Sequence, residues 1–156
     1  MKNLIATLLT AYISLWGLAT AAQAQPTKKL PLNEPDYNRP KLFADLPDRI
    51  DFNPTDLLNL FELQPGQPVN VTIGTGFIFA GDLISKSIDN HSSSVVLLST
   101  NRPGARLVFT RIKGENNSVK YLGRIISFKH GDCYEIASEN DHYYFKKKSI
   151  YDVISE

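Results

Sequence analysis

Along most of the chain after Pro68, hydrophobic and polar residues alternate, a pattern that is typical of β-strands with one buried face. In VNVTI (69–73), valine and isoleucine alternate with asparagine and threonine. Turn-forming residues then separate further apolar segments, which are FIFAGDLISKS, VVLLST, ARLVFTRIK, VKYLGRIISF, CYEIAS and HYYFKKK. The short, regular spacing predicts an antiparallel meander of about seven strands.

Glycines inside two of the longer predicted strands indicate the shape of the sheet. Gly81 and Gly123 each lie near the middle of a segment, where a glycine marks a bulge or a sharp bend. We therefore expect a mainly β fold with a strongly curved sheet, either a small barrel or a sandwich. The last segment, SIYDVISE (149–156), predicts a final short strand.

A different pattern precedes the strands and predicts one short helix near residues 54–63. Asn53 is a suitable N-cap, Pro54 fits the first helical position, and Asp56 suits the positive end of the helix dipole. Leucine and phenylalanine give this segment an apolar face, and Pro65-Gly66 ends it.

The first residues have the pattern of a secretory signal peptide, residues 1–24. One basic residue, Lys2, precedes an apolar run, and the small residues Ala22-Gln23-Ala24 follow it. A membrane anchor is the alternative, but the run is short for a bilayer and no basic stop-transfer cluster follows directly. We expect cleavage near Ala24-Gln25, a secreted or periplasmic protein, and no transmembrane segment in the mature chain.

Residues 25–41 are rich in proline and predict an extended or disordered leader, because proline fixes φ and removes an amide donor. From Leu42 onward large apolar residues return, and we expect residues 42–156 to form a single β-rich domain whose first segment covers the core.

Charge and cysteine content limit the possible partners. Cleavage removes Lys2 and no acid, so the mature chain has 16 basic and 16 acidic residues, which argues against nucleic acid. The single cysteine, Cys133, cannot form an internal disulfide. Stability must come from ordinary burial or from dimerisation, and a homodimer stays an open alternative.

One stretch, ISFKHGDCYE (126–135), contains the residue types of a nucleophilic site. A cysteine nucleophile needs a base beside it and a group that orients the base, roles that His130 and Asp132 would take beside Cys133. The spacing is instead typical of a hairpin turn, with Gly131 at the reversal. We expect a structural turn with Cys133 buried, and no catalytic site.

A second stretch, HYYFKKK (142–148), combines aromatic and basic residues. Alternation places Tyr144, Lys146 and Lys148 on one side, and Lys129 lies in the preceding turn. These residues are candidates for binding an anionic polymer or a membrane surface; alternatively, the lysines protect an edge strand from pairing. The three histidines are scattered and no phosphate-binding glycine motif is present, so we expect neither a metal nor a cofactor.

The function expected from these features is that of an exported non-enzymatic domain that binds a protein or an extracellular polymer. Binding would use a sheet face, an edge strand or the leader. The first alternative is an inhibitor or pro-domain-like accessory of a secreted hydrolase, which would present the NRPGA turn (101–105) to an enzyme cleft. The second is a cysteine-dependent enzyme that uses Cys133 and His130.

Overall fold

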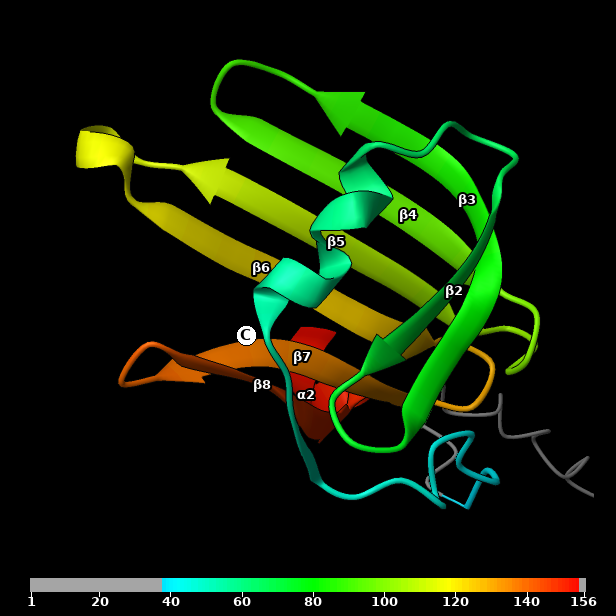
Figure 1. The fold of residues 1–156 in the computed structure, drawn as a ribbon. Coiled ribbons are helices and arrows are strands. Elements are labelled where there is room, and N and C mark those ends of the chain that lie inside the picture. Colours follow the sequence, from blue (N-terminus) through cyan, green and yellow to red (C-terminus); the bar gives the residue numbers. More distant parts are fainter. Residues whose placement is uncertain (1–37, 155–156) are drawn as a thin grey trace, which may run out of the picture. The chain divides into compact units, whose positions relative to one another are not determined.

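A single antiparallel sheet of eight strands organises the part of the chain that the computed structural model describes, residues 38–154 (Figure 1). The predicted signal peptide and residues 25–37 of the leader lie outside the described residues. The strands are β1 (Arg49–Asp51), β2 (Pro68–Ile73), β3 (Phe77–Ile88), β4 (Ser92–Ser99), β5 (Arg106–Lys113), β6 (Val119–Ser127), β7 (Asp132–Glu139) and β8 (His142–Ser149). The helices are the 3-10 helices η1 (Pro54–Phe61) and η2 (Glu115–Asn117) and the α-helix α2 (Ile150–Ile154).

The sheet runs in the order β1-β8-β7-β6-β5-β4-β3-β2 and curls into a half-barrel (Figure 1). At Gly81 an added Cβ would lie 2.2 Å from the Leu98 carbonyl oxygen, and at Gly123 one would lie 2.4 Å from that of Val108. At these two positions the neighbouring backbone therefore approaches too closely for a side chain. The prediction of a curved, mainly β meander is confirmed.

The inner, concave face of the sheet carries the core, which η1 covers. Leu57, Leu60 and Phe61 of this helix are buried, and the Phe61 ring stacks on Phe109 of β5 with centroids 5.5 Å apart. The predicted cap is present, because the side-chain oxygen of Asn53 accepts a hydrogen bond from the backbone of Thr55 at 3.1 Å. Aromatic residues also fill the space between η1 and the sheet, so the interior is packed with side chains.

Two elements differ from the sequence-based predictions. Arg49–Asp51, expected in a covering segment, forms the edge strand β1, with Ile50 opposite Phe145 of β8. Only three residues pair in β1, too few for a period of two to be recognised in the sequence.

The predicted final strand is wrong, because residues 150–154 form α2. Ser149 starts this helix through two reciprocal bonds. Its Oγ accepts from the backbone N–H of Tyr151 at 3.4 Å, and its own N–H donates to the Asp152 carboxylate at 3.3 Å. This arrangement is a capping box, which fixes the helix start locally and ends the strand.

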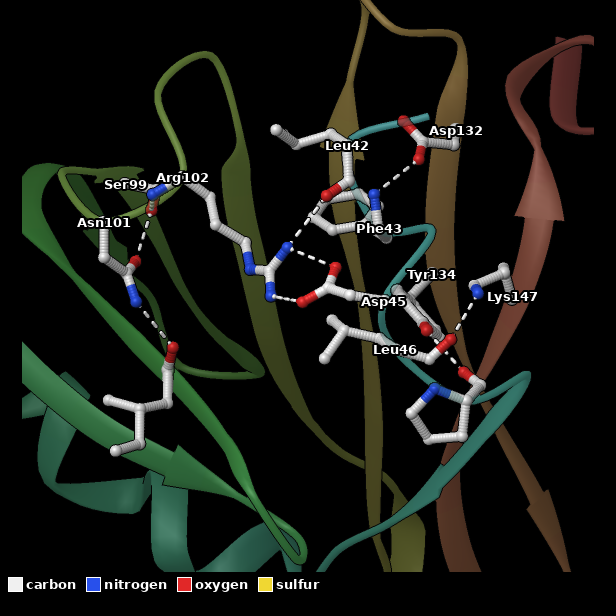
Figure 2. Close-up of polar contacts among 12 residues, drawn as sticks. Leu42, Phe43, Asp45, Leu46, Ser99, Asn101, Arg102, Asp132, Tyr134 and Lys147 are labelled. Atoms are coloured by element: carbon white, nitrogen blue, oxygen red, sulfur yellow. Dashed lines mark hydrogen bonds and ion pairs between the residues drawn. The ribbon is translucent and has the colours of Figure 1, made fainter. Parts of the chain in front are cut away.

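Residues 40–48, which we call the strap, cross one end of the half-barrel before β1. Phe43 is fully buried and packs on the Tyr134 ring, with centroids 5.5 Å apart. Its backbone N–H donates to the Asp132 carboxylate at 2.8 Å (Figure 2). The expectation that this segment covers the core is thereby confirmed.

Side chains of the sheet and its turns fasten the strap by bonding to its backbone carbonyls (Figure 2). Arg102, in the turn between β4 and β5, donates to the carbonyl of Leu42 at 2.8 Å and to both carboxylate oxygens of Asp45. The Tyr134 hydroxyl donates to the carbonyl of Pro47, and the Lys147 ammonium to that of Leu46. The strap is therefore part of the folded domain.

Candidate functional site

The residues of the predicted nucleophilic cluster have separate structural roles. Cys133 is fully buried, as expected, and burial raises the pKa of its thiol to about 11, with the Glu135 carboxylate adding to the effect. His130 Nδ1 lies 2.9 Å from the Pro40 carbonyl oxygen, and Asp132 accepts from the strap. Within residues 38–154, neither His130 nor Asp132 forms a hydrogen bond with Cys133.

The basic and aromatic candidates are divided between β8 and a turn. Tyr144 lies under the guanidinium of Arg49, whose central carbon is 3.8 Å from the ring centroid. Lys148 pairs with Glu135 at 2.8 Å, while Lys146 is exposed. Lys129 is exposed in the turn after β6, where Phe128 precedes it.

Glu135 changes the character of this surface, because it also pairs with Arg124 of β6 at 2.8 Å. Hydrogen bonding to Lys148, and then to Arg124, lowers the pKa of the Glu135 carboxyl. The carboxylate of β7 thus lies between basic side chains of β6 and β8, and the surface is mixed in charge.

A groove of about 600 Å³ borders the free side of β2, the last strand at one end of the sheet. We call it the edge groove. One wall is β2 itself, which pairs on its other side with β3. The opposite wall comes from η1 and the residues just after it. The lining residues are Thr55, Asp56, Asn59, Leu60, Leu63, Pro68, Val69, Asn70, Val71, Thr72 and Gly74.

A second depression, of about 780 Å³, shares Asp56 and Gly74 with the edge groove, and we call it the acidic hollow. Carboxylates dominate its lining, which includes Asp51, Asp56, Glu139 and Asp141 beside Arg49 and His142. Arg49 lies 2.7 Å from Asp51 and 3.6 Å from Glu139. The remaining carboxylates, Asp56 and Asp141, give this end of the groove a negative charge.

Gly74 lies where the two ends of the curled sheet approach each other. It has φ of +57°, and an added Cβ would lie 2.2 Å from the Asp51 carbonyl oxygen of β1. The turn between β2 and β3 therefore touches β1, and only glycine fits this contact. The edge groove and the acidic hollow meet at this point.

A third depression, of about 550 Å³, lies between the strap, the end of β8 and α2. Lys41, Asp132 and Lys147 line it, and each already bonds within the domain. Lys41 donates to the Gly131 carbonyl at 3.4 Å, Asp132 accepts from Phe43, and Lys147 bonds the strap and lies 3.6 Å from Asp48. These polar groups are used for holding the strap.

Among residues 38–154, no group of three or more histidine, cysteine or carboxylate side chains has an arrangement that could hold a metal ion. No helix in the same range has the length and apolar character needed to cross a bilayer.

Comparison of the chain with protein-family models, curated proteins and solved structures finds no match in any of the three. The structure by itself defines the class: a mainly β domain built on one curled antiparallel sheet with two free edges (Figure 1).

Sequence reasoning did not single out the edge groove or the acidic hollow. One signal for the edge was present, because Pro68 opens β2 and proline, which lacks an N–H, is confined to edge strands and strand starts. The acidic hollow had no such signal, since its carboxylates come from β1, η1, the end of β7 and the turn that follows it.

Proposed function

We propose that this chain is an exported, non-enzymatic interaction module that binds an extended segment of a protein partner along β2. The observation that carries the proposal is the free edge of β2 beside a groove. The signal-peptide pattern of residues 1–24 supports export.

The free edge of β2 supplies the main-chain recognition. In an antiparallel pair, half of the N–H and C=O groups of an edge strand point away from the paired neighbour. An extended peptide placed along β2 would form hydrogen bonds with these N–H and C=O groups, as in other cases of strand addition. Recognition through the backbone requires few conserved side-chain contacts, which fits a groove lined mainly by small polar residues and β-branched residues.

The opposite wall limits what can bind. Because Thr55 and Asn59 of η1 face the groove across from β2, the space accepts one extended chain and excludes the edge of a second sheet. Leu63, which is only partly buried, adds apolar contact for side chains of the bound segment. The favoured partner is therefore a single extended segment.

The charge of the adjoining hollow indicates the composition of that segment. A peptide that follows β2 toward Gly74 reaches Asp56 and Asp141. A lysine or arginine at that end would be attracted by these carboxylates. We therefore expect a β-forming segment with a basic residue at one end.

The buried Cys133 supports a non-enzymatic role, because a thiol with a pKa of about 11 is protonated at neutral pH and shielded from substrates. The NRPGA turn gives the inhibitor alternative less support. Arg102 is turned toward the strap, and Asn101 accepts from the backbone of Ala80 and donates to the Ile78 carbonyl. The side chains of Asn101 and Arg102, which this turn would present to a hydrolase, thus form hydrogen bonds within the domain.

The test uses a fluorescein-labelled KTVTVTK peptide and the same peptide N-methylated at alternate residues. We expect saturable binding of the first by fluorescence anisotropy, and at least about ten-fold weaker binding of the second, because strand addition depends on backbone N–H groups.

A variant locates the binding site. Asn59→Tyr places a ring in the edge groove from an exposed position and should abolish binding, whereas Glu62→Tyr, on the exposed residue that follows η1, should leave it unchanged. Equal binding of both peptides, or binding that survives Asn59→Tyr in a folded protein, would contradict the proposal.

A further inference from the structure

A separate feature lies on the outer, convex face, where β6 and β7 diverge. Their pairing ends at Arg124 opposite Glu135. The pairing of β5 with β6 continues much further, to Lys113 opposite Val119. Figure 1 shows the resulting gap between the two ribbons on the side away from the strap. β6 and β7 therefore separate beyond this pair, while the sheet stays continuous through the pairs from Arg124–Glu135 to Ser127–Asp132, and we call this separation the split.

A depression of about 510 Å³ lies at this split, and we call it the outer hollow. Its surface is mainly apolar. The lining residues are Val96, Arg106, Val108, Thr110, Leu122, Gly123, Arg124, Ile126, Phe128, Glu135 and Ile136. Leu122 is 40% exposed and Phe128 61% exposed, although both are large hydrophobic residues.

Burying these side chains would be favourable, since each Å² of apolar surface removed from water contributes about 25 cal/mol. The split adds depth, because Ile136, a buried residue of the inner face, also lines the hollow. An apolar group that enters beside Leu122 therefore reaches the edge of the core.

The charged residues at the hollow indicate the rest of the ligand. Arg124 pairs with Glu135 at 2.8 Å, and Glu135 also pairs with Lys148 at 2.8 Å, so one carboxylate is shared by two cations. Arg106 is exposed, and no acidic side chain within residues 38–154 forms an ion pair with it. The hollow thus combines an apolar surface with an excess of positive charge, to which Arg106 contributes a guanidinium that no carboxylate of the described residues pairs with.

We propose that the outer hollow binds a free anionic amphiphile, a medium-length alkyl chain with a carboxylate head. The carboxylate lies at Arg106, and the chain runs over Ile126 and Leu122 toward the split. The register supports this orientation, because Arg106 is opposite Ile126 and Gly123 lies three residues along β6, about 10 Å away. The inference rests on a surface separate from the edge groove and does not depend on peptide binding.

The test compares decanoate with decyltrimethylammonium, both below their micellar concentrations, by calorimetry and by the NMR shift of the Gly123 amide. We expect decanoate to bind saturably and more tightly than the cation. Arg106→Gln should weaken the binding of decanoate roughly three-fold and reduce the preference for the anion over the cation. Leu122→Asn should lower the affinity for both ligands roughly ten-fold, because it removes apolar surface from the hollow.

Lys120→Gln is the matched control, because Lys120 is an exposed cation of β6, the strand of Leu122, and lies outside the hollow. It should change neither the affinity for decanoate nor that for decyltrimethylammonium. All these positions are exposed, so the variants keep the fold. Absence of saturable decanoate binding, equal affinity for the two head groups, or binding that Leu122→Asn leaves intact would overturn the proposal. Binding to anionic phospholipid vesicles without binding to free decanoate would also overturn it.

Discussion

Arg102 illustrates how much of this fold depends on single polar side chains. Its guanidinium bonds the Leu42 carbonyl and both carboxylate oxygens of Asp45, and its side chain is only 19% exposed. The hydrogen bond to Arg102 is the main cause that lowers the pKa of Asp45. One residue of a turn therefore fixes the conformation of a segment far away in the sequence.

Replacing Arg102 with methionine should lower the free energy of unfolding by about 1–3 kcal/mol, because the Leu42 carbonyl loses its donor while the apolar stem is kept. Urea unfolding followed by circular dichroism measures the change. Arg106→Met, at an exposed arginine without an ion pair among the described residues, is the control and should be within about 0.5 kcal/mol of the parent. Equal stability of the two variants would show that the contacts of Arg102 are not needed to hold the strap.

Cys133 allows a second prediction at this scale. Because burial shields the thiol and raises its pKa to about 11, iodoacetamide at pH 8 should leave it unmodified in the folded protein. Mass spectrometry should show complete alkylation in urea at the same pH, which serves as the control. Rapid alkylation of the native protein would contradict the buried position and reopen the cysteine-enzyme alternative.

At the scale of elements, the sequence predicts β2 to β8 and η1 but does not predict β1 or α2. Alternation of apolar and polar residues predicts β2 to β8, because successive side chains of a strand point to opposite sides of the sheet and one side faces the core. The cap at Asn53 likewise predicts where η1 begins. The strand β1 and the helix α2 could not be predicted in the same way, since pairing with β8 and a local capping box determine them.

The candidate site was less predictable than the fold. The edge groove depends on which strand ends the sheet, and that follows from β1 pairing with β8 instead of β2. The outer hollow depends on where the pairing of β6 with β7 stops. Both are properties of registers between distant segments, which a single sequence does not reveal.

Gly123 gives a prediction about the curl of the sheet. In Gly123→Ala, the new Cβ would lie 2.4 Å from the Val108 carbonyl oxygen and 3.0 Å from Ile136, so β5 and β6 would have to separate. We expect a loss of about 2 kcal/mol in the free energy of unfolding, measured by urea titration. Lys120→Ala, on the exposed part of the same strand, should cost less than about 0.5 kcal/mol. A neutral Gly123→Ala would mean that the close approach of the strands is not required.

The acidic hollow gives a prediction about peptide charge. KTVTVTK should bind more tightly than TTVTVTT, and ETVTVTE should bind least, with the differences shrinking as salt is raised. Asp56→Asn should reduce the preference for lysine, because Asp56 lines both the edge groove and the acidic hollow. Equal affinities for the three peptides would remove the charge preference while leaving strand addition intact.

At the scale of the whole molecule, carboxylates on separate elements make the fold sensitive to acid. The pKa is lowered for Asp45 by Arg102, for Asp89 by the backbone N–H groups of His91 and Ser92, and for Glu135 by Lys148 and Arg124. Each carboxyl favours the folded state when it is ionised. Because all three pKa values are lowered in the folded protein, the direction in which stability changes with pH can be predicted.

A lowered folded-state pKa contributes stability that is present above the unfolded value and is lost as pH falls through the folded value. The unfolded values are 3.8 for aspartate and 4.5 for glutamate, so unfolding free energy should fall steadily below about pH 4.5. Urea midpoints measured from pH 7 to pH 2.5 test this. Glu135→Gln should be less stable than the parent at pH 7 and should approach it at pH 2.5, and parallel curves would contradict the assignment.

The pairing of β1 with β8 also bears on the order of events during folding. Arg49 lies opposite Lys146, so almost the whole domain separates the two strands in sequence. The side chains that fasten the strap, such as Tyr134 and Lys147, likewise come late in the chain. The first part of the domain therefore cannot reach its native position until the last strand has been made, and such long-range closure is slow. Closure of the half-barrel and fastening of the strap consequently depend on residues that are translated last, whereas the hairpins from β2 to β7 join strands that are neighbours in sequence.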